Sequence, residues 1–299
     1  MWEYIVKFKG PYNFNLLINR LGRDPLHEVN KEERSIKVPL LIQNEKRVVE
    51  VQFIGRTEDP AFNVRSINAP KSEQDLILKN LNEIFQWDKS LSKLQEHFAK
   101  TELAPLFYLF AGAPIIREFD PYRCLVKCII HQQLNLKFAA TLSERFVKGF
   151  GEEVEGVWFY PTPEKVSSLT VEELREMQFS ERKAEYLIQT SEKVASGQLD
   201  LEKLSELSDE EIIKQLTALR GIGPWTAENM LLFAYGREDI YPVGDIGIQN
   251  ALKKLLNLEK KPTKDMMIQL GEKWAPYRSY ATLYLWLSME NEKVRSESE

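Results

Sequence analysis

Leu219-Arg-Gly-Ile-Gly-Pro-Trp-Thr-Ala227 is the most informative stretch of this chain, because it places two glycines between two helical segments. Glycine adopts positive φ and lets a ligand approach the backbone closely, so Gly221 and Gly223 suit an open turn. Pro224 suits the first turn of the next helix, whose free amides attract an anion. The stretch therefore predicts a helix, a hairpin turn and a second helix over about 208–236, with a phosphate-binding turn. A Gly-x-Gly pair is equally typical of an ordinary turn between packed helices, and that alternative stays open.

A carboxylate, Asp245, follows this unit nineteen positions beyond Thr226. A fixed carboxylate can stabilise the positive charge that develops on a sugar when its base leaves, and it can orient or deprotonate the attacking water. An Asp directly before a helix that starts near Ile246 is also a common N-cap. The two roles are compatible, because a cap holds the carboxylate in place. Two nearby acids, Glu238 and Asp239, are interpreted as solvated loop charges.

The composition is ordinary for a soluble protein, with 43% hydrophobic and 28% charged residues among 299. This length suffices for two or three domains. No run of 18 apolar residues is present and the N-terminus lacks the features of a signal peptide, so we expect a cytoplasmic protein without a membrane span. Two cysteines, Cys124 and Cys128, are too few for a metal or iron–sulfur site and are interpreted as buried, reduced thiols.

The net charge of −5 argues against a nucleic-acid partner, because phosphate neutralisation usually shows as a basic surface. Backbone amides at a helix N-terminus also bind phosphate, and they add nothing to the formal charge. The charge therefore predicts a modest, salt-sensitive affinity and does not exclude such a partner.

The hydrophobic pattern changes from strand-like to helical near residue 72. Before it, apolar residues alternate from Trp2 to Phe8 and from Ile36 to Leu40, and Val48 to Ile54 is a further strand candidate. One helix is expected over about 12–20. After it, apolar residues recur at helical spacing. The later helices are expected at about 121–131, 136–149, 171–177, 181–196, 208–218, 225–236, 246–256, 263–275 and 278–289.

The expected fold class is α+β, with a small β-rich N-terminal domain followed by a mainly α-helical region. The boundaries are expected at 1–100 for the α+β domain, 101–290 for the helical region and 291–299 for a polar tail. Two helix starts have the residue spacing of a capping box, namely Thr170 with Glu173 and Ser208 with Glu211.

Further segments extend the pattern of the hairpin stretch. They are Leu125-Val-Lys-Cys-Ile-Ile-His-Gln-Gln133, Tyr160-Pro-Thr-Pro163, Ser180-Glu-Arg-Lys-Ala184 with Tyr186, and Pro242-Val-Gly-Asp-Ile246. Together with the hairpin they resemble the helix-hairpin-helix DNA glycosylase superfamily and, within it, the bacterial 3-methyladenine DNA glycosylase II type. The resemblance covers about 120–290 and implies a helix-hairpin-helix glycosylase region there. The β-rich N-terminal region agrees with that type only in its length and its structural class.

The resemblance implies roles for five groups of residues. Asp245 is the expected catalytic residue. The expected base pocket consists of Trp225, Trp286, Tyr280 and Tyr284, although aromatic residues in the last helix are also typical of core packing. Gly221, Gly223 and Thr226 are expected to bind a DNA phosphate. Gln133 or Leu134 is expected to be the wedge that fills the gap left by a flipped base. The main-chain carbonyls of Thr217, Leu219 and Ile222 are expected to hold a monovalent cation, whereas His131 is interpreted as structural.

Trp225 stands where related lyases carry a lysine that forms a Schiff base, which an indole cannot do. The resemblance thus implies a monofunctional DNA N-glycosylase of base excision repair. It would hydrolyse the N-glycosidic bond of alkylated purines in damaged double-stranded DNA and leave an abasic site. We expect a monomer that needs no cofactor beyond the hairpin cation.

Two alternatives remain from the sequence, a non-catalytic helix-hairpin-helix DNA-binding protein and a bifunctional oxidised-guanine glycosylase/lyase. Aromatic faces attract an electron-poor alkylated base through cation–π contact. The family type has tyrosines where this chain has Asn229 and Ile246, so the pocket is less aromatic. The range of damaged bases therefore stays open, as does the role of the N-terminal domain.

Overall fold

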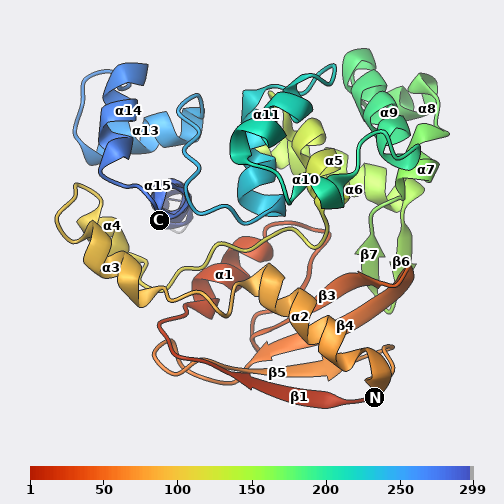
Figure 1. Cartoon of the computed structure of the whole chain (residues 1–299), viewed down its shortest axis with the longest axis horizontal. Coiled ribbons are helices and arrows are strands. Elements are labelled where there is room, and N and C mark those ends of the chain that lie inside the picture. The colour runs from red at the N-terminus through yellow and green to blue at the C-terminus, as the bar shows by residue number, and fades with distance from the viewer. Residues whose placement is uncertain (297–299) are drawn as a thin grey trace.

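The N-terminal part of the molecule is a five-stranded antiparallel sheet. The computed structural model describes residues 1–296, with side chains as far as residue 290. The strand order is β1 (Glu3–Lys7), β5 (Ala61–Ser66), β4 (Glu45–Phe53), β3 (Ser35–Ile42) and β2 (Glu28–Asn30). Two helices, α1 (Phe14–Leu21) and α2 (Gln74–Phe85), lie between the sheet and the rest of the molecule (Figure 1). The strands and the helix expected before residue 72 are therefore confirmed.

Burial on both faces of β4 shows how this sheet joins the helical region. Val48 and Val49 are consecutive in the strand and point to opposite faces, yet both are 0% exposed. Val49 belongs to the main core, whereas Val48 packs against Val157 and Phe159. These two residues lie in β7 (Val157–Phe159), which pairs with β6 (Glu152–Val154) in a hairpin that descends onto the sheet (Figure 1). This hairpin was not expected from the sequence.

The remainder of the described chain is mainly helical, so the α+β fold class is confirmed. Its elements, in chain order, are a 3-10 turn η1 (Lys71–Glu73), α3 (Ser92–Phe98), α4 (Ala104–Leu109), α5 (Pro121–His131), α6 (Leu136–Phe150), α7 (Pro163–Ser167), α8 (Val171–Glu176), α9 (Glu181–Ala195), α10 (Leu201–Leu204), α11 (Asp209–Thr217), α12 (Pro224–Asn229), a π-helical turn η2 (Met230–Ala234), α13 (Ile246–Leu255), α14 (Lys264–Glu272) and α15 (Arg278–Ser296). Both expected capping boxes are present, at the starts of α8 and α11.

Helices α3 and α4 lie beside α15, far from the sheet that precedes them in the chain (Figure 1). The ring of Phe107 stacks between Phe98, at 3.8 Å between centroids, and Tyr284, at 4.0 Å. The indole of Trp274 donates a hydrogen bond to Glu102 at 2.8 Å. The expected boundary at residue 100 thus falls between two helices that pack together on the C-terminal helix.

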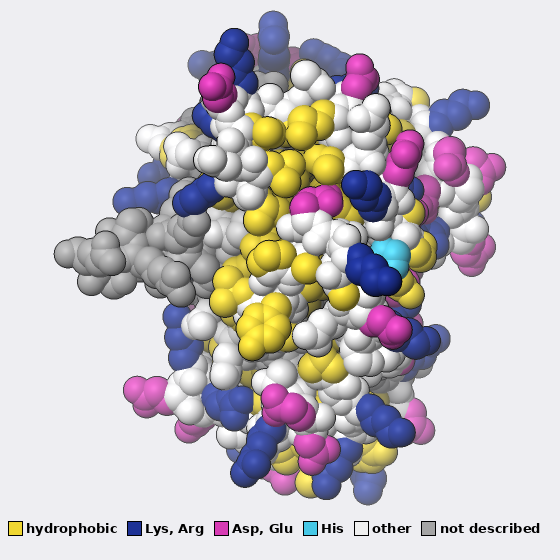
Figure 2. Space-filling model, turned by 90° about the vertical axis from the view of Figure 1, so that its left-hand side faces the viewer, with side chains coloured by type: hydrophobic (Ala, Val, Ile, Leu, Met, Phe, Trp, Pro, Cys, Tyr) yellow, Lys and Arg dark blue, Asp and Glu magenta, His cyan; other side chains and the backbone are white. Residues whose placement is uncertain are grey.

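Helix α15 continues as far as Ser296, into the stretch expected to be a polar tail, and residues 297–299 lie outside the described part. None of the helices in the described part of the chain has the length and hydropathy of a membrane-spanning helix. Figure 2 shows hydrophobic side chains gathered along the middle of one face, bordered by charged ones. On that side of the molecule, α4 exposes Tyr108 and Leu109 while it buries Leu106 and Phe107 against the core.

Candidate active site

A cavity of about 520 Å³ is lined by residues from both parts of the molecule. Its wall comes from α1 and the loop after it, the segment 113–119, the facing sides of α5 and α6, α12, the start of α13 and α15. Most of the lining is hydrophobic, with a few charged side chains, as is usual for small-molecule sites of this volume. Four residues of the expected site lie in this wall, namely Leu134, Trp225, Asp245 and Trp286.

Asp245 is held by three hydrogen-bond donors. It is the N-cap of α13, and its Oδ1 accepts from the amide of Ile248 at 2.9 Å. The indole Nε1 of Trp286 donates to the same oxygen at 3.0 Å, and the indole of Trp225 donates to Oδ2 at 3.0 Å. The cap and the two indoles together fix the orientation of the carboxylate. We call this group of Asp245, Trp225 and Trp286 the Asp245 site.

All three donors to Asp245 are neutral. Among the described residues, no Lys or Arg forms an ion pair with it, so its contacts orient the charge without cancelling it. Glu228 lies one turn along α12 from Trp225 and interacts with this charge. Burial and the negative charge of Asp245 raise the pKa of Glu228 to about 7, although Lys264 opposes the shift. A carboxylate held in this way can stabilise a cation that forms beside it.

Beside Asp245, two stacked aromatic rings line the cavity, and a guanidinium group lies over them. The rings of Trp286 and Phe233 stack with centroids 5.8 Å apart. The guanidinium carbon of Arg20 lies 5.9 Å from the Trp286 ring and 5.7 Å from the Phe233 ring, and its Nε is 3.8 Å from Glu290. Since Arg20 belongs to α1, the N-terminal part of the chain contributes directly to this cavity.

Two of the four residues that the sequence predicts in the base pocket lie outside the cavity. Tyr280 and Tyr284 are 2% and 1% exposed and do not line the cavity. Tyr284 stacks on Phe107, and its hydroxyl donates to the carbonyl of Ala113 at 3.4 Å. Burial raises the pKa of both phenols. The prediction is wrong for these two because their face of α15 packs into the core, whereas Trp286 lies on a different face.

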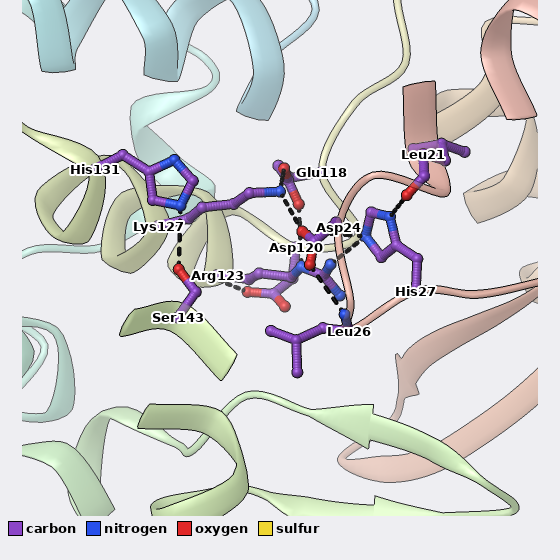
Figure 3. Close-up of polar contacts among 10 residues, drawn as sticks. All are labelled: Leu21, Asp24, Leu26, His27, Glu118, Asp120, Arg123, Lys127, His131 and Ser143. Atoms are coloured by element: carbon purple, nitrogen blue, oxygen red, sulfur yellow. Dashed lines mark hydrogen bonds and ion pairs between the residues drawn. The ribbon is translucent and has the colours of Figure 1, made fainter. Parts of the chain in front are cut away.

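A group of buried charges forms another part of the wall (Figure 3). The ammonium of Lys127, on α5, donates to Glu118 Oε1 at 2.7 Å and to Asp24 Oδ2 at 2.9 Å. Arg123, one turn earlier, donates to Glu118 Oε2 at 3.0 Å and to His27 Nε2 at 2.5 Å. We call Asp24, His27, Glu118, Arg123 and Lys127 the ionic cluster. It joins the loop after α1 to α5.

The charges within the ionic cluster stabilise one another against burial. Burial opposes ionisation of Glu118, but the charges of Lys127 and Arg123 outweigh it and lower the pKa of Glu118 to about 2. Burial and the Arg123 charge lower the pKa of His27 to about 4. His27 is therefore neutral at pH 7, donating from Nδ1 to the carbonyl of Leu21 and accepting from Arg123 at Nε2.

His131 ends α5 and also lines the cavity. Its Nε2 lies 3.1 Å from the hydroxyl of Ser143 (Figure 3). Burial, and then the charge of Lys127, lower its pKa to about 4. The sequence interpretation of His131 as structural fits this contact with α6, although the side chain also faces the cavity.

The hairpin turn has the geometry that its glycines suggest. Gly221 has φ of +85°, and a Cβ placed there would lie 2.3 Å from the ring of Tyr186. Only glycine therefore fits, both for its backbone conformation and for its contact. At Gly223, which caps α12, a Cβ would meet nothing within 4 Å. The space above this second glycine is open to a ligand.

Thr226 is buried, and its hydroxyl accepts a hydrogen bond from Gln132 Nε2 at 2.9 Å. Because Thr226 is buried, its hydroxyl does not reach a phosphate at the surface, and only its main-chain amide, in the first turn of α12, remains a candidate. The same Gln132 nitrogen donates to the carbonyl of Gly221 at 2.9 Å. Gln132 therefore ties the loop after α5 to the hairpin, a contact that the sequence prediction missed.

That loop contains both expected wedge residues. Gln133 is exposed and has φ of +57°, whereas Leu134 is half-buried and lines the cavity. Lys183, on α9, supports the loop by donating to the carbonyls of Ile130 and Gln132 at 2.5 and 2.9 Å. Burial lowers the pKa of Lys183 to about 8. The choice between Gln133 and Leu134 as the wedge stays a prediction.

The expected cation ligands lie at the end of α11 and in the hairpin turn. The carbonyl of Leu219 accepts from the amide of Ile222 at 3.1 Å and keeps a second lone pair. Carbonyl oxygens suit a hard cation, so Thr217, Leu219 and Ile222 fit a monovalent ion, and the ion itself stays a prediction. No cluster of His, Cys, Asp and Glu among the described residues could hold a metal.

Comparison with known proteins decides the family. Residues 126–276 match the HhH-GPD superfamily base excision DNA repair protein model, and this range contains the hairpin and Asp245. The chain belongs to this family. A putative DNA-3-methyladenine glycosylase of Bacillus subtilis (strain 168) is 45% identical over 97% of this chain and 100% of its own length.

Solved structures agree with this placement in the HhH-GPD superfamily. The fold resembles that of a 3-methyladenine DNA-glycosylase from Archaeoglobus fulgidus, with a TM-score of 0.84 over 96% of this chain and 97% of the other, at 24% identity. A 3-methyladenine DNA glycosylase of Schizosaccharomyces pombe, solved in complex with abasic DNA, is 33% identical with a TM-score of 0.59, covering 65% of this chain and 95% of its own.

In this HhH-GPD protein, the residues that the sequence prediction missed are those of the ionic cluster, together with Arg20 and Gln132. Asp24 and Glu118 come from loops that are remote in sequence and carry no motif. One signal was present, since Lys127 and His131 are four residues apart and thus share a face of α5. Nothing in the sequence indicated which charges that face would meet.

Proposed function

We propose that this protein is a monofunctional DNA glycosylase that hydrolyses the N-glycosidic bond of alkylated purines, of the 3-methyladenine type, in double-stranded DNA. The observation that carries the proposal is the Asp245 carboxylate, held by two indole N–H groups in the wall of a cavity of about 520 Å³. That volume suits a flipped nucleobase. The names of the similar proteins support the choice of substrate.

In the proposed reaction, the damaged nucleotide is flipped out of the duplex, at a cost of a few kcal/mol that is least for a damaged pair. Gln133 or Leu134 fills the gap that it leaves in the base stack. As the base departs, positive charge develops on the sugar, and the uncompensated Asp245 carboxylate stabilises it. Asp245 also orients or deprotonates the water that attacks the sugar, and the products are the free base and an abasic site.

An alkylated purine leaves easily because it is electron-poor, so the site needs no general acid. The aromatic faces of Trp286 and Phe233 offer such a base a surface on which to stack. This cation–π interaction favours the binding of alkylated purines over that of undamaged ones. The guanidinium of Arg20 over the same rings sets a limit to the space available, and it shares the carboxylate of Glu290 with Arg23.

The monofunctional assignment rests on the amines near the cavity. A lyase needs a neutral lysine amine to form a Schiff base with the sugar. Among the described residues, Lys127 is the only lysine that lines the cavity, and its ammonium donates hydrogen bonds to two carboxylates. Although burial opposes the charge, Glu118 and Asp24 outweigh it and raise the pKa of Lys127 above its ordinary value, so it is not a nucleophile. This argues against the oxidised-guanine glycosylase/lyase alternative.

DNA binding is assigned to the hairpin, with the main-chain amides at Gly221, Gly223 and Thr226 facing a phosphate and a monovalent cation on the carbonyls of Thr217, Leu219 and Ile222. The open space at Gly223 supports this assignment. The protein is proposed to act as a monomer. A non-catalytic hairpin protein is the second candidate, and the cavity with its oriented carboxylate favours the enzyme over it.

The decisive experiment incubates the protein with methylated double-stranded DNA, identifies the released bases by chromatography and tests for strand nicking. We expect release of 3-methyladenine and intact strands until alkali is added. Nicking without alkali that disappears on mutating a lysine would indicate the lyase. Binding to DNA with no base released would leave only the non-catalytic hairpin protein.

A further inference from the structure

The ionic cluster does more than bury paired charges, because part of it is open. Arg123 is 2% exposed, but the side chains of Asp24, Glu118 and Lys127 keep 15%, 18% and 20% of their surface accessible. All three are part of the wall of the cavity that contains Asp245. A cluster that only joined two parts of a protein would need no such opening.

The open groups have a definite hydrogen-bonding capacity. An ammonium has three N–H groups, and in the described contacts Lys127 uses two of them, on Asp24 and Glu118. Each carboxylate has lone pairs beyond those that Lys127, Arg123 and the amide of Leu26 occupy. The cluster therefore offers two acceptors and one donor side by side. The edge of an aminopurine presents the complementary groups, an amino N–H and a ring nitrogen or carbonyl.

We propose that the ionic cluster binds the hydrogen-bonding edge of the flipped base. The carboxylates of Asp24 and Glu118 accept from its exocyclic amino group, and the ammonium of Lys127 donates to a ring nitrogen or carbonyl. The inference rests on the proposed function, since it assigns the polar contacts of the same substrate. It makes Asp24 and Glu118 specificity-determining residues and gives the N-terminal part of the chain a role in choosing the base.

The consequence is a preference that aromatic stacking alone would not give. The 6-amino group of 3-methyladenine or the 2-amino group of 7-methylguanine can donate to the two carboxylates. Hypoxanthine has no exocyclic amino group, since it carries a carbonyl oxygen at C6, which the carboxylates repel, and only a hydrogen at C2. A site built to accept from an N–H group discriminates strongly, because its buried polar groups are otherwise left unpaired. Replacing one carboxylate with an amide adds an N–H donor and should weaken this discrimination.

The test compares the wild type with Asp24→Asn and Glu118→Gln on methylated DNA and on a duplex containing hypoxanthine. We expect excision of 3-methyladenine and 7-methylguanine to fall about tenfold, and the ratio of methylpurine to hypoxanthine excision to fall by at least that factor. Binding to DNA with an abasic site, which has no base to place in the cavity, should stay within about twofold. Asp59→Asn, at an exposed position in the loop between β4 and β5, is the matched control.

Thermal unfolding of each variant shows whether it folds, and the ratio between substrates is insensitive to a loss of folded protein. Unchanged methylpurine excision by both variants would overturn the proposal. Equal losses on every substrate together with weaker abasic-site binding would also overturn it, since they indicate a structural cluster alone. Failure of the wild type to release any methylated base would instead contradict the proposed function, and the two failures are thus distinguishable.

Discussion

The Asp245 site and the ionic cluster both place carboxylates in the wall of one cavity, but with opposite kinds of partner. Asp245 receives hydrogen bonds from two indoles and one amide, all of them neutral. Asp24 and Glu118 both receive a hydrogen bond from Lys127, Glu118 also receives one from Arg123, and Asp24 also receives one from the amide of Leu26. The first carboxylate is oriented and keeps its charge, whereas the others are neutralised by the cations beside them.

This difference shows that the charge of the partners decides what a buried carboxylate can do. A catalytic carboxylate has to stabilise a cation that is not there in the ground state, so it must not be paired beforehand. A carboxylate in a buried ion pair contributes to stability and to hydrogen bonding, and removing its partner is costly. Four predictions test this contrast between the two groups.

The largest expected effect is that of Asp245→Asn on excision. Asparagine is also a good N-cap, so the helix start at Ile246 should survive and the unfolding free energy should change by about 1 kcal/mol or less. The charge is lost, however, and the rate of excision should fall at least about 1000-fold, roughly 4 kcal/mol. Single-turnover kinetics on methylated DNA would measure the rate. A variant within tenfold of the wild type would contradict the assignment.

Removing the central cation of the ionic cluster should lower the stability of the protein. Lys127→Met leaves the carboxylates of Asp24 and Glu118 without their shared cation, and the unfolding free energy should fall by about 3–5 kcal/mol. Urea unfolding would measure it. Lys148→Met is the control, because Lys148 pairs with Glu144 at the exposed surface of α6, and its loss should cost about 0.5 kcal/mol or less. Equal losses in the two variants would contradict the contrast.

The orientation of Asp245 can be weakened without removing its charge. Trp225→Phe and Trp286→Phe each delete one N–H donor to the carboxylate, and each should lower the rate of excision about tenfold, since hydrogen bonds to charged groups are worth about 1.5–3 kcal/mol. Trp87→Phe is the matched control, because the Nε1 of Trp87 is buried without a partner in the described structure. An equal effect of the control would mean that ring packing, and not orientation, matters.

A further prediction is a pH dependence of stability from His131. Its pKa is lowered to about 4 from an ordinary value of 6.5, so between these values the unfolded chain binds a proton that the folded protein excludes. The unfolding free energy therefore has its full value with respect to His131 above pH 6.5. It falls by about 1.4 kcal/mol per pH unit as the pH drops from 6.5 toward 4. In His131→Gln, urea unfolding between pH 7 and pH 5 should show a shallower slope than in the wild type. An identical slope would contradict the lowered pKa.

Local sequence signals predicted the parts of the site that a short segment determines. The two hairpin glycines, Pro224 at a helix start and the Asp245 cap each follow from the conformational preferences of a few neighbouring residues. The capping boxes of α8 and α11 have the same local origin. Such features were predictable because no distant contact is needed to produce them.

Contacts between remote segments were not predictable from one sequence. The ionic cluster joins Asp24 to Lys127, and nothing near either residue indicates the other. Helical spacing placed Tyr284 and Trp286 on the last helix correctly, but it could not show that Phe107 would cover Tyr284. The hairpin of β6 and β7 was missed because its strands are short and depend on contacts with remote segments, such as the packing on Val48.

The most direct test of the central assignment is a crystal structure of this protein with duplex DNA that carries a cationic pyrrolidine in place of the deoxyribose of the damaged nucleotide. The ring nitrogen of that analogue has the positive charge that develops on the sugar. We predict the Asp245 carboxylate within hydrogen-bond distance of this nitrogen, with the indoles of Trp225 and Trp286 still donating to it and the hairpin amides on a phosphate. A pyrrolidine seated beside another carboxylate, with Asp245 remote from the sugar, would contradict the account.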